Sequence, residues 1–202
     1  MKTKFPRVLF FDIGGVLLSD GWGHKSRQKA AKKFEYNYEE MEQLHHFIFN
    51  IYEIGRITMD EYLDRTIFSK PVKFTREDFK AFLFSQSTEL PDTLKWLKKW
   101  KTEHPSCPII SINNEGRELN DYRIQKFGLH DCFDAFISSC EVGMRKPDPQ
   151  IFKLALGVAL VKPDESVYFD DRPMHVEAAR KLGIQAYHHQ DFTSTKKIIE
   201  NL

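Results

Sequence analysis

The residues best suited to chemistry stand at the ends of apolar segments. Asp12 directly follows the apolar run Val8–Phe11 and directly precedes Ile13-Gly14-Gly15. An aromatic and β-branched run of this kind is typical of a buried strand, and ligands gather outside the carboxyl ends of such strands. Asp12 can therefore act as a nucleophile or metal ligand, and the turn can bring backbone amides such as that of Gly15 close to an anion. The alternative is a structural role, in which Asp12 caps a loop or helix.

Three other segments place polar groups after apolar runs or ahead of helices. They are Asn113-Asn114 after Ile109–Ile112, the segment 143–149 around Lys146, and Asp170-Asp171 after Val167–Phe169. The carboxyl ends of parallel strands meet at one edge of a sheet, so these groups are expected to converge with Asp12 on one site.

The elements that would hold these groups form an alternating pattern. Short apolar runs at 8–11, 109–112, 135–137, 167–169 and 185–187 are separated, after the second, by segments with helical spacing. Alternating strands and helices predict an α/β fold with a doubly wound parallel sheet.

The interval between the first two strands is much longer than a single crossover requires. Within it, apolar residues recur at helical spacing, and two threonines precede acidic residues as helix caps do. These positions are Met41, Leu44, Ile48, Ile51, Thr58 and Thr75. Pro91 is predicted to open the helix that returns the chain to the sheet. We therefore predict a helical cap domain over residues 19–89, inserted into a core domain over residues 1–18 and 90–202.

Composition excludes several classes of partner. Lys plus Arg is 30 and Asp plus Glu is 29, giving a net charge of +1, which provides no footprint for nucleic acid or an anionic membrane. The three cysteines are an odd number without paired spacing, which argues against a disulfide framework or a zinc site. Lys2 and Lys4 precede an apolar stretch, but Asp12 interrupts it, unlike a signal peptide. We expect a soluble, cytoplasmic protein whose oligomeric state is open.

The four polar segments, taken in order, resemble the haloacid dehalogenase (HAD) superfamily. The similarity is densest over residues 128–183, which include the Gly-x-Arg-Lys-Pro-Asp-Pro run at 143–149 and Phe-Asp-Asp-Arg at 169–172. It covers the core but not the insertion. The later segments are also similar to a branch of sugar-1-phosphate phosphatases. The resemblance implies a Rossmann-like HAD core, a helical cap and a small phosphorylated metabolite as substrate.

The resemblance also implies catalytic and metal-binding roles. Asp12 would attack phosphorus and form an aspartyl-phosphate, and Lys146 would neutralise the transferring phosphoryl group. The implied cofactor is Mg²⁺, bound by Asp12, Asp170 and the carbonyl of Gly14, with Asp171 acting through a water. Oxygen ligands with several retained waters suit this ion. The structural alternative for Asp170-Asp171 is a helix cap ahead of Pro173.

Substrate binding is expected from a smaller group. Asn113 takes the place of a family Ser or Thr that donates a hydrogen bond to phosphate, and an amide can donate the same bond. Asn114, Lys146 and the backbone of Gly15 are expected to assist it. Arg145 is expected to face solvent.

The sequence departs from most phosphatases of the superfamily at Gly14, where they carry a second aspartate that acts as general acid and base. Such help is typically worth about 10²- to 10⁴-fold. The favoured interpretation is a Mg²⁺-dependent phosphatase whose leaving group, as in an anomeric sugar phosphate, needs little protonation, or which borrows an acid from the cap. Two alternatives stay open: a metal-independent 2-haloacid dehalogenase, and a non-catalytic phosphate-binding or interaction protein.

Several cap residues have no assigned role. Trp22 and His24 begin the cap near Asp12, and the segment 53–56, which ends in Arg56, joins two cap helices and is able to reach the site. The pair His45-His46 is expected at the cap surface, because adjacent helical positions face different directions.

Overall fold

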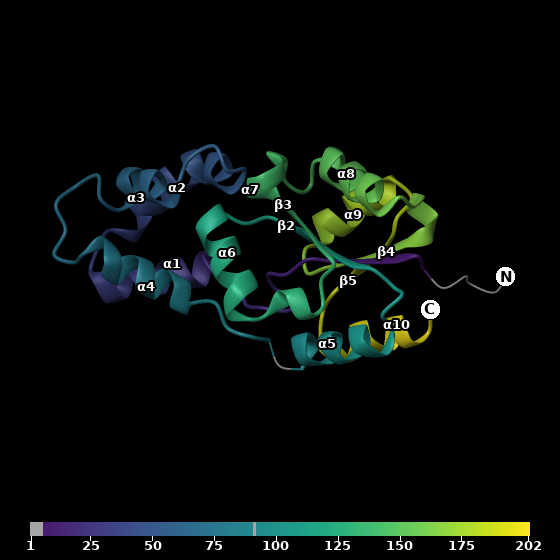
Figure 1. Cartoon of the computed structure of the whole chain (residues 1–202). Coiled ribbons are helices and arrows are strands. Elements are labelled where there is room, and N and C mark those ends of the chain that lie inside the picture. Colours follow the sequence, from purple (N-terminus) through teal and green to yellow (C-terminus); the bar gives the residue numbers. More distant parts are fainter. Residues whose placement is uncertain (1–5, 91) are drawn as a thin grey trace.

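A parallel β-sheet covered by helices on both faces forms one part of the molecule, and a helical lobe extends from one end of it (Figure 1). The structure, a computed structural model, describes residues 6–90 and 92–202. The first five residues, including Lys2 and Lys4, and Pro91 lie outside the described residues. The architecture confirms the predicted α/β fold with a doubly wound parallel sheet.

The sheet has five strands in the order β3-β2-β1-β4-β5, and every neighbouring pair is parallel. The strands are β1 (Val8–Phe11), β2 (Ile109–Asn113), β3 (Ala135–Ser138), β4 (Ser166–Asp170) and β5 (Gln185–His188). All five strands predicted from the apolar runs are confirmed. Since β1 lies between β2 and β4, the carboxyl ends that carry the polar residues are neighbours.

Side chains alternate between the two faces of the sheet and fill two hydrophobic clusters. Leu9 and Phe11 of β1 pack with residues of α5 (Thr93–Glu103) and α10 (Phe192–Glu200). Val8 and Phe10 face the other way, toward α8 (Pro149–Ala159) and α9 (Pro173–Lys181). The remaining core helices are α6 (Arg117–Lys126), α7 (Ser139–Val142), and the 3-10 turns η1 (Leu129–Asp131) and η2 (Pro163–Glu165). No helix among residues 6–90 and 92–202 has the length and apolar character needed to cross a membrane.

The lobe consists of α1 (His24–Phe34), α2 (Tyr38–Glu53), α3 (Met59–Thr66) and α4 (Arg76–Ser85), packed around a third, aromatic-rich cluster. Both predicted helix starts are confirmed. The Thr58 hydroxyl accepts a hydrogen bond from the Glu61 amide at 3.2 Å, and the Thr75 hydroxyl accepts one from the Asp78 amide at 3.1 Å. These caps satisfy amide groups that have no partner inside the helix.

The two chain segments that join the lobe to the sheet, 17–19 and 88–90, run antiparallel to each other and are hydrogen-bonded. Leu18 and Glu89 form an isolated bridge, the Ser19 amide donates to the Thr88 carbonyl at 2.9 Å, and the Leu90 amide donates to the Leu17 carbonyl at 3.0 Å. These contacts support the division into a core of 1–18 and 90–202 and a cap of 19–89, which stays a prediction.

Candidate active site

A cavity of about 330 Å³ lies where the cap covers the carboxyl ends of the strands. Its volume suits a small ligand. The lining combines strand-end residues with cap residues, and most of them are polar or charged. They are Asp12, Gly14, Asp20, Trp22, Gly23, His24, Arg27, His45, Phe49, Glu53, Asn113, Asn114, Glu115, Arg123, Arg145, Arg172 and His175.

Asp12 and Lys146 form the centre of the site. Lys146 Nζ lies 3.0 Å from Asp12 Oδ1, which also accepts a hydrogen bond from the Ile13 amide at 2.8 Å. Within residues 6–90 and 92–202, no hydrogen bond is directed at Asp12 Oδ2, so this oxygen is available for reaction. Burial raises the pKa of Asp12 to about 7, against the opposing effect of Lys146. A bound cation would restore the ionised form.

Asp170 is fully buried and surrounded by donors. Its Oδ2 lies 2.7 Å from Lys146 Nζ and also accepts from the Tyr168 hydroxyl. Its Oδ1 accepts from the Arg172 amide at 2.8 Å, and His175 Nδ1 lies 3.1 Å from Oδ2. Although burial alone would raise the pKa of Asp170, Lys146 and His175 hold it well below its ordinary value. Asp170 therefore anchors Lys146 as an ionised partner.

Asp171 has the opposite environment. Its Oδ1 is buried without a hydrogen-bond partner, and its pKa is raised by burial and by the charge of Asp170. Asp12, Asp170 and His175 place ligand atoms within 4.8 Å of one another. The oxygen donors and the excess of negative charge fit Mg²⁺. The Asp170 oxygens already accept several bonds, whereas Asp171 Oδ1 is buried without one, and the division of metal-binding roles between the two acids stays a prediction.

Two predicted substrate-binding groups are engaged elsewhere. Asn114 Oδ1 accepts from the Lys146 amide at 2.8 Å, and its Nδ2 donates to the Lys146 carbonyl at 2.9 Å, so Asn114 holds the backbone of Lys146, and its part in substrate binding stays a prediction. The Gly15 amide donates to the Leu18 carbonyl at 2.7 Å and is not free for an anion. Asn113 is buried in the cavity wall and donates one bond, to Asn120 Oδ1 at 3.3 Å, so its role in binding phosphate stays a prediction.

Position 15 requires glycine because of its backbone conformation and its closeness to Asp171, and not because its amide binds an anion. Gly15 has a φ of 73°, and a Cβ there would lie 2.4 Å from Asp171 Oδ2. The bare backbone thus packs directly against the Asp171 carboxylate. This close approach places the first and last polar segments of the site side by side.

Gly14 faces a buried ion pair. A Cβ at this position would lie 3.8 Å from Arg123 Nη1, and Arg123 Nη1 in turn lies 2.6 Å from Glu115 Oε2. Most phosphatases of the superfamily have an aspartate at this position that supplies a proton. This chain has no side chain there, and the nearest group is the Arg123 guanidinium. Neither Arg123 nor Glu115 was expected at the site, because the sequence of α6 and of the loop before it contains no motif that indicates a functional site.

The tip of the cap is docked on α7. Ser139 Oγ donates to the Glu53 carbonyl at 2.6 Å. A Cβ on Gly55, whose φ is 73°, would lie only 2.1 Å from the Cys140 carbonyl oxygen. Arg145 pairs with Glu53 across the same interface, at 2.6 Å between Nε and Oε2. The expectation that Arg145 faces solvent was therefore wrong, because the cap descends onto it.

We expect Gly55→Ala to loosen this docking. The new methyl group would collide with a carbonyl that belongs to a different element, so the cap must shift, and a shift of about 1 Å can cost about 10²-fold in rate. kcat/KM should fall by about that factor. Gly143→Ala is the matched control, since Gly143 has a similar φ of 67° but nothing within 4 Å of the added atom. Equal losses of kcat/KM in the two variants would contradict the docking role.

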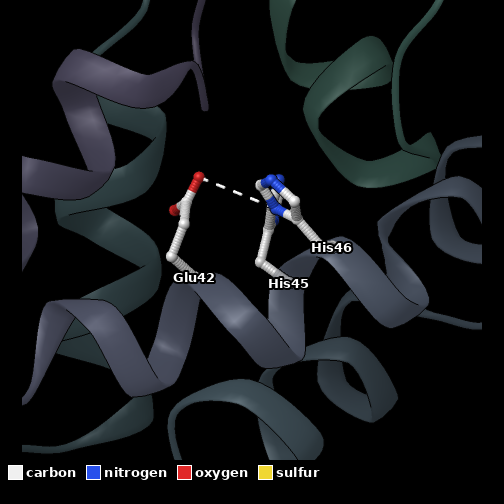
Figure 2. Close-up of side chains that lie close together, drawn as sticks. All are labelled: Glu42, His45 and His46. Atoms are coloured by element: carbon white, nitrogen blue, oxygen red, sulfur yellow. Dashed lines mark ion pairs between the residues drawn. The ribbon is translucent and has the colours of Figure 1, made fainter.

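A second group of potential metal ligands lies on α2, where Glu42, His45 and His46 are close together (Figure 2). Arg27 occupies both carboxylate oxygens of Glu42, at 2.6 Å and 2.8 Å, and lowers the pKa of Glu42 to about 2. A metal ion would have to displace this guanidinium. The cluster is therefore better explained as an ion pair that fixes α1 to α2. His46 is exposed as expected, but His45 is buried, contrary to the expected surface position.

His45 is held in one form by neighbours that the sequence does not reveal. Trp22 Nε1 donates to the Tyr62 hydroxyl at 3.0 Å, and the same hydroxyl lies 2.8 Å from His45 Nδ1. Burial lowers the pKa of His45 to about 3. The Tyr62 hydroxyl can accept from both neighbours or donate to one of them, so Nδ1 either donates to it or accepts its proton. In both cases His45 is neutral and lines the cavity wall.

His175 is a further residue of the site that was not predicted. It lies on α9, five positions after Asp170, and contacts that carboxylate. Its place soon after the Asp170-Asp171 pair is a usable signal. Arg56, in contrast, is exposed and is not among the residues that line the cavity.

Comparisons with known proteins agree with this geometry. The profile of haloacid dehalogenase-like hydrolases matches residues 6–183. A phosphorylated carbohydrates phosphatase of Thermotoga maritima is 25% identical over 88% of this chain and 82% of its own length. The pig bifunctional epoxide hydrolase 2 (Sus scrofa) is 48% identical over 28% of this chain, and the aligned part is 10% of its own length.

Solved structures extend the similarity to nearly the whole chain. The HAD family enzyme bt-2542 of Bacteroides thetaiotaomicron, in complex with magnesium and inorganic phosphate, superposes with a TM-score of 0.78 at 25% identity, covering 94% of this chain and 98% of that one. On the sequence match, the shared fold and the convergence of the four polar segments, the chain belongs to the haloacid dehalogenase-like hydrolase family.

Proposed function

We propose that this chain is a Mg²⁺-dependent phosphatase that hydrolyses a small phosphate monoester through an aspartyl-phosphate on Asp12. The observation that carries the proposal is the position of Lys146 Nζ, fully buried between Asp12 at 3.0 Å and Asp170 at 2.7 Å. Burying a charged lysine is costly unless its charge is used. Placed beside a carboxylate with a free oxygen at the floor of a cavity, it suits the transfer of an anionic group.

The residues divide the work as follows. Asp12 Oδ2 attacks phosphorus while Oδ1 is held by the Ile13 amide and Lys146. The ester oxygen leaves, and water later hydrolyses the aspartyl-phosphate to release phosphate and restore Asp12. Lys146 offsets the repulsion between an anionic nucleophile and an anionic substrate, and a Mg²⁺ ion held at the site would add further positive charge there. We assign Asp12, Asp171 and the carbonyl of Gly14 as ligands of this ion, with Asp170 acting through a water.

The cavity favours a hydroxyl-rich substrate such as a sugar or polyol phosphate. Carboxylates accept hydroxyl protons, and guanidinium and imidazole groups donate to hydroxyl oxygens. The walls supply both kinds, with Glu53 and Asp20 as acceptors and Arg172 as a donor. The relative from Thermotoga maritima, named for phosphorylated carbohydrates, supports the same class. The chain spans only about a tenth of the epoxide hydrolases, so their names say little about its substrate.

The two alternatives fit the cavity less well. A haloacid dehalogenase has to hold a halide leaving group among apolar side chains, whereas this cavity is lined mainly by charged and polar groups. A phosphate-binding module has no use for a nucleophile. The arrangement of Asp12 with one anchored and one free oxygen therefore favours catalysis.

The test is phosphate release from a panel of sugar, polyol and alkyl phosphates, with Mg²⁺ or with a chelator. We expect release that requires the metal and that stops when the chelator is added. Chloride release from 2-chloropropionate without metal would favour the dehalogenase instead. Binding of inorganic phosphate by calorimetry with no turnover of any ester would favour the binding module.

A further inference from the structure

The proposed phosphatase reaction leaves one proton unassigned. When the phosphorus–oxygen bond breaks, the departing oxygen carries negative charge and, for an alkyl or sugar ester, must be protonated. Gly14 has no side chain, and its neighbour Arg123 is paired with the Glu115 carboxylate. The inference that follows rests on the proposed function and concerns the group that supplies this proton.

Three carboxyl groups besides Asp12 line the cavity: Asp20, Glu53 and Glu115. Asp20 is exposed to solvent. Glu115 uses both oxygens, since Oε2 lies 2.6 Å from Arg123 Nη1 and Oε1 accepts from the Gly116 amide at 3.2 Å. A carboxylate fixed in this way is a poor proton donor. Glu53 is left as the candidate.

Glu53 is buried, but its carboxyl group has an oxygen without a hydrogen-bond partner. Its side chain is 8% exposed, and its Oε2 lies 2.6 Å from Arg145 Nε. The Arg145 N–H is not directed at this oxygen, however, and both atoms are buried without a hydrogen bond. A buried polar group without a partner is costly. Its position in the cavity wall indicates that a ligand completes its contacts.

The charges around Glu53 keep its acid form available. Burial raises the pKa of Glu53 to about 7, with Glu115 acting in the same direction. Arg145, Arg172 and Lys146 face it and act in the opposite direction without reversing the shift. A general acid is most effective when its pKa lies near the working pH, and Glu53 meets that condition.

The chain brings Glu53 to the site only through the cap. Glu53 is the last residue of α2, and its carbonyl is held by Ser139 Oγ at 2.6 Å. Gly55, two residues after Glu53 in the chain, lies directly against the Cys140 carbonyl. The same docking that brings the cap over the strand ends therefore positions the carboxyl group in the cavity wall.

We propose that Glu53 is the general acid and base that replaces the side chain missing at Gly14. As Asp12 bonds to phosphorus and the ester bond breaks, the Glu53 carboxyl gives its proton to the departing oxygen, which leaves as an alcohol. The resulting Glu53 carboxylate then takes a proton from the water that attacks the aspartyl-phosphate. Inorganic phosphate leaves, and both carboxyl groups return to their starting states.

The test compares Glu53→Gln with wild type on p-nitrophenyl phosphate, whose leaving group needs no proton, and on phenyl phosphate, whose leaving group does. We compare kcat/KM, which reports only the steps up to departure of the leaving group and leaves out the later hydrolysis that both esters share. We expect kcat/KM for phenyl phosphate to fall about 10²-fold or more, and kcat/KM for p-nitrophenyl phosphate to fall less than about tenfold. The wild-type kcat/KM for phenyl phosphate should also decline above about pH 7, because Glu53 then loses its proton, and this decline should be absent in the variant.

Glu115→Gln is the matched control, since it removes another buried carboxylate of the same cavity and should affect both esters equally. Thermal unfolding checks that each variant is folded. An equal loss of kcat/KM on both esters in Glu53→Gln, or an unchanged decline at high pH, would show that Glu53 is only structural. If wild type hydrolyses neither ester with Mg²⁺, the proposed function itself is wrong and this inference falls with it.

Discussion

Replacing Asp12 with asparagine is expected to abolish phosphate release, with a loss in kcat of about 10⁴-fold or more, as removal of a catalytic nucleophile generally does. The amide is nearly the same shape and still accepts from the Ile13 amide through Oδ1, but it cannot form the acyl phosphate. A steady-state assay with the best substrate of the ester panel, at saturating Mg²⁺, measures the effect.

The fold should survive this change. Burial raises the pKa of Asp12 to about 7 from 3.8. A raised carboxyl pKa favours the folded state at low pH, and that contribution is lost as the pH rises through about 7. At pH 8 without metal the variant should therefore have a Tm at least as high as wild type, with a smaller difference at pH 5.

A matched control is Asp20→Asn, which removes a more exposed carboxylate from the same cavity. We expect its activity to stay within about tenfold of wild type, since the amide oxygen of asparagine still accepts a hydroxyl proton. Residual activity of Asp12→Asn above about a hundredth of wild type would require another nucleophile, and would contradict the assignment.

The features that could be predicted from sequence are those decided locally. The run Val8–Phe11 is buried on both faces, so its composition alone predicts a central parallel strand. Thr58 and Thr75 satisfy amides within three residues of themselves, and both helix starts followed from that spacing. The convergence of Asp12, Lys146 and Asp170 followed because parallel strands expose their carboxyl ends at one edge.

The features that could not be predicted depend on partners that are distant in the chain. Asn114 was assigned to substrate, but its amide is occupied by the backbone of Lys146, 32 positions away. Arg145 was expected in solvent, but the cap places Asn50 and Glu53 against its guanidinium. The sequence shows which hydrogen-bonding groups a side chain has. The tertiary contacts, including those made by the cap, determine which of these groups remain without a partner.

The two neighbouring acids at the end of β4 illustrate the same limit. Asp170 and Asp171 are chemically identical and adjacent, so sequence offers no basis for dividing their roles. The strand geometry directs Asp170 to Lys146 and Tyr168, while Asp171 lies against Gly15 with one buried oxygen unsatisfied. Because side chains alternate in direction along an extended chain, the two carboxylates meet different neighbours.

Replacing Lys146 with methionine is expected to damage stability and activity together. Although burial opposes its charge, Asp12 and Asp170 raise the pKa of Lys146 above its ordinary value, so it is ionised in the folded protein. Removing one partner from a buried ionic group typically costs about 3–5 kcal/mol, because the remaining charges are left unpaired. For a chain of this size we expect Tm to fall by about 10 °C, and kcat to fall about 10²- to 10³-fold.

The cause of this loss can be separated from a simple packing defect. If two unpaired carboxylates are responsible, Mg²⁺ should raise the Tm of Lys146→Met more than that of wild type, since the cation replaces the lost charge. The double variant Asp12→Asn/Lys146→Met should likewise regain stability over the single variant but stay inactive. Lys153→Met, on the exposed side of α8, controls for the exchange of a charged for an apolar side chain and should leave Tm nearly unchanged. A cavity or packing defect would respond neither to Mg²⁺ nor to the second substitution, and that result would show that the charge of Lys146 does not hold the site together.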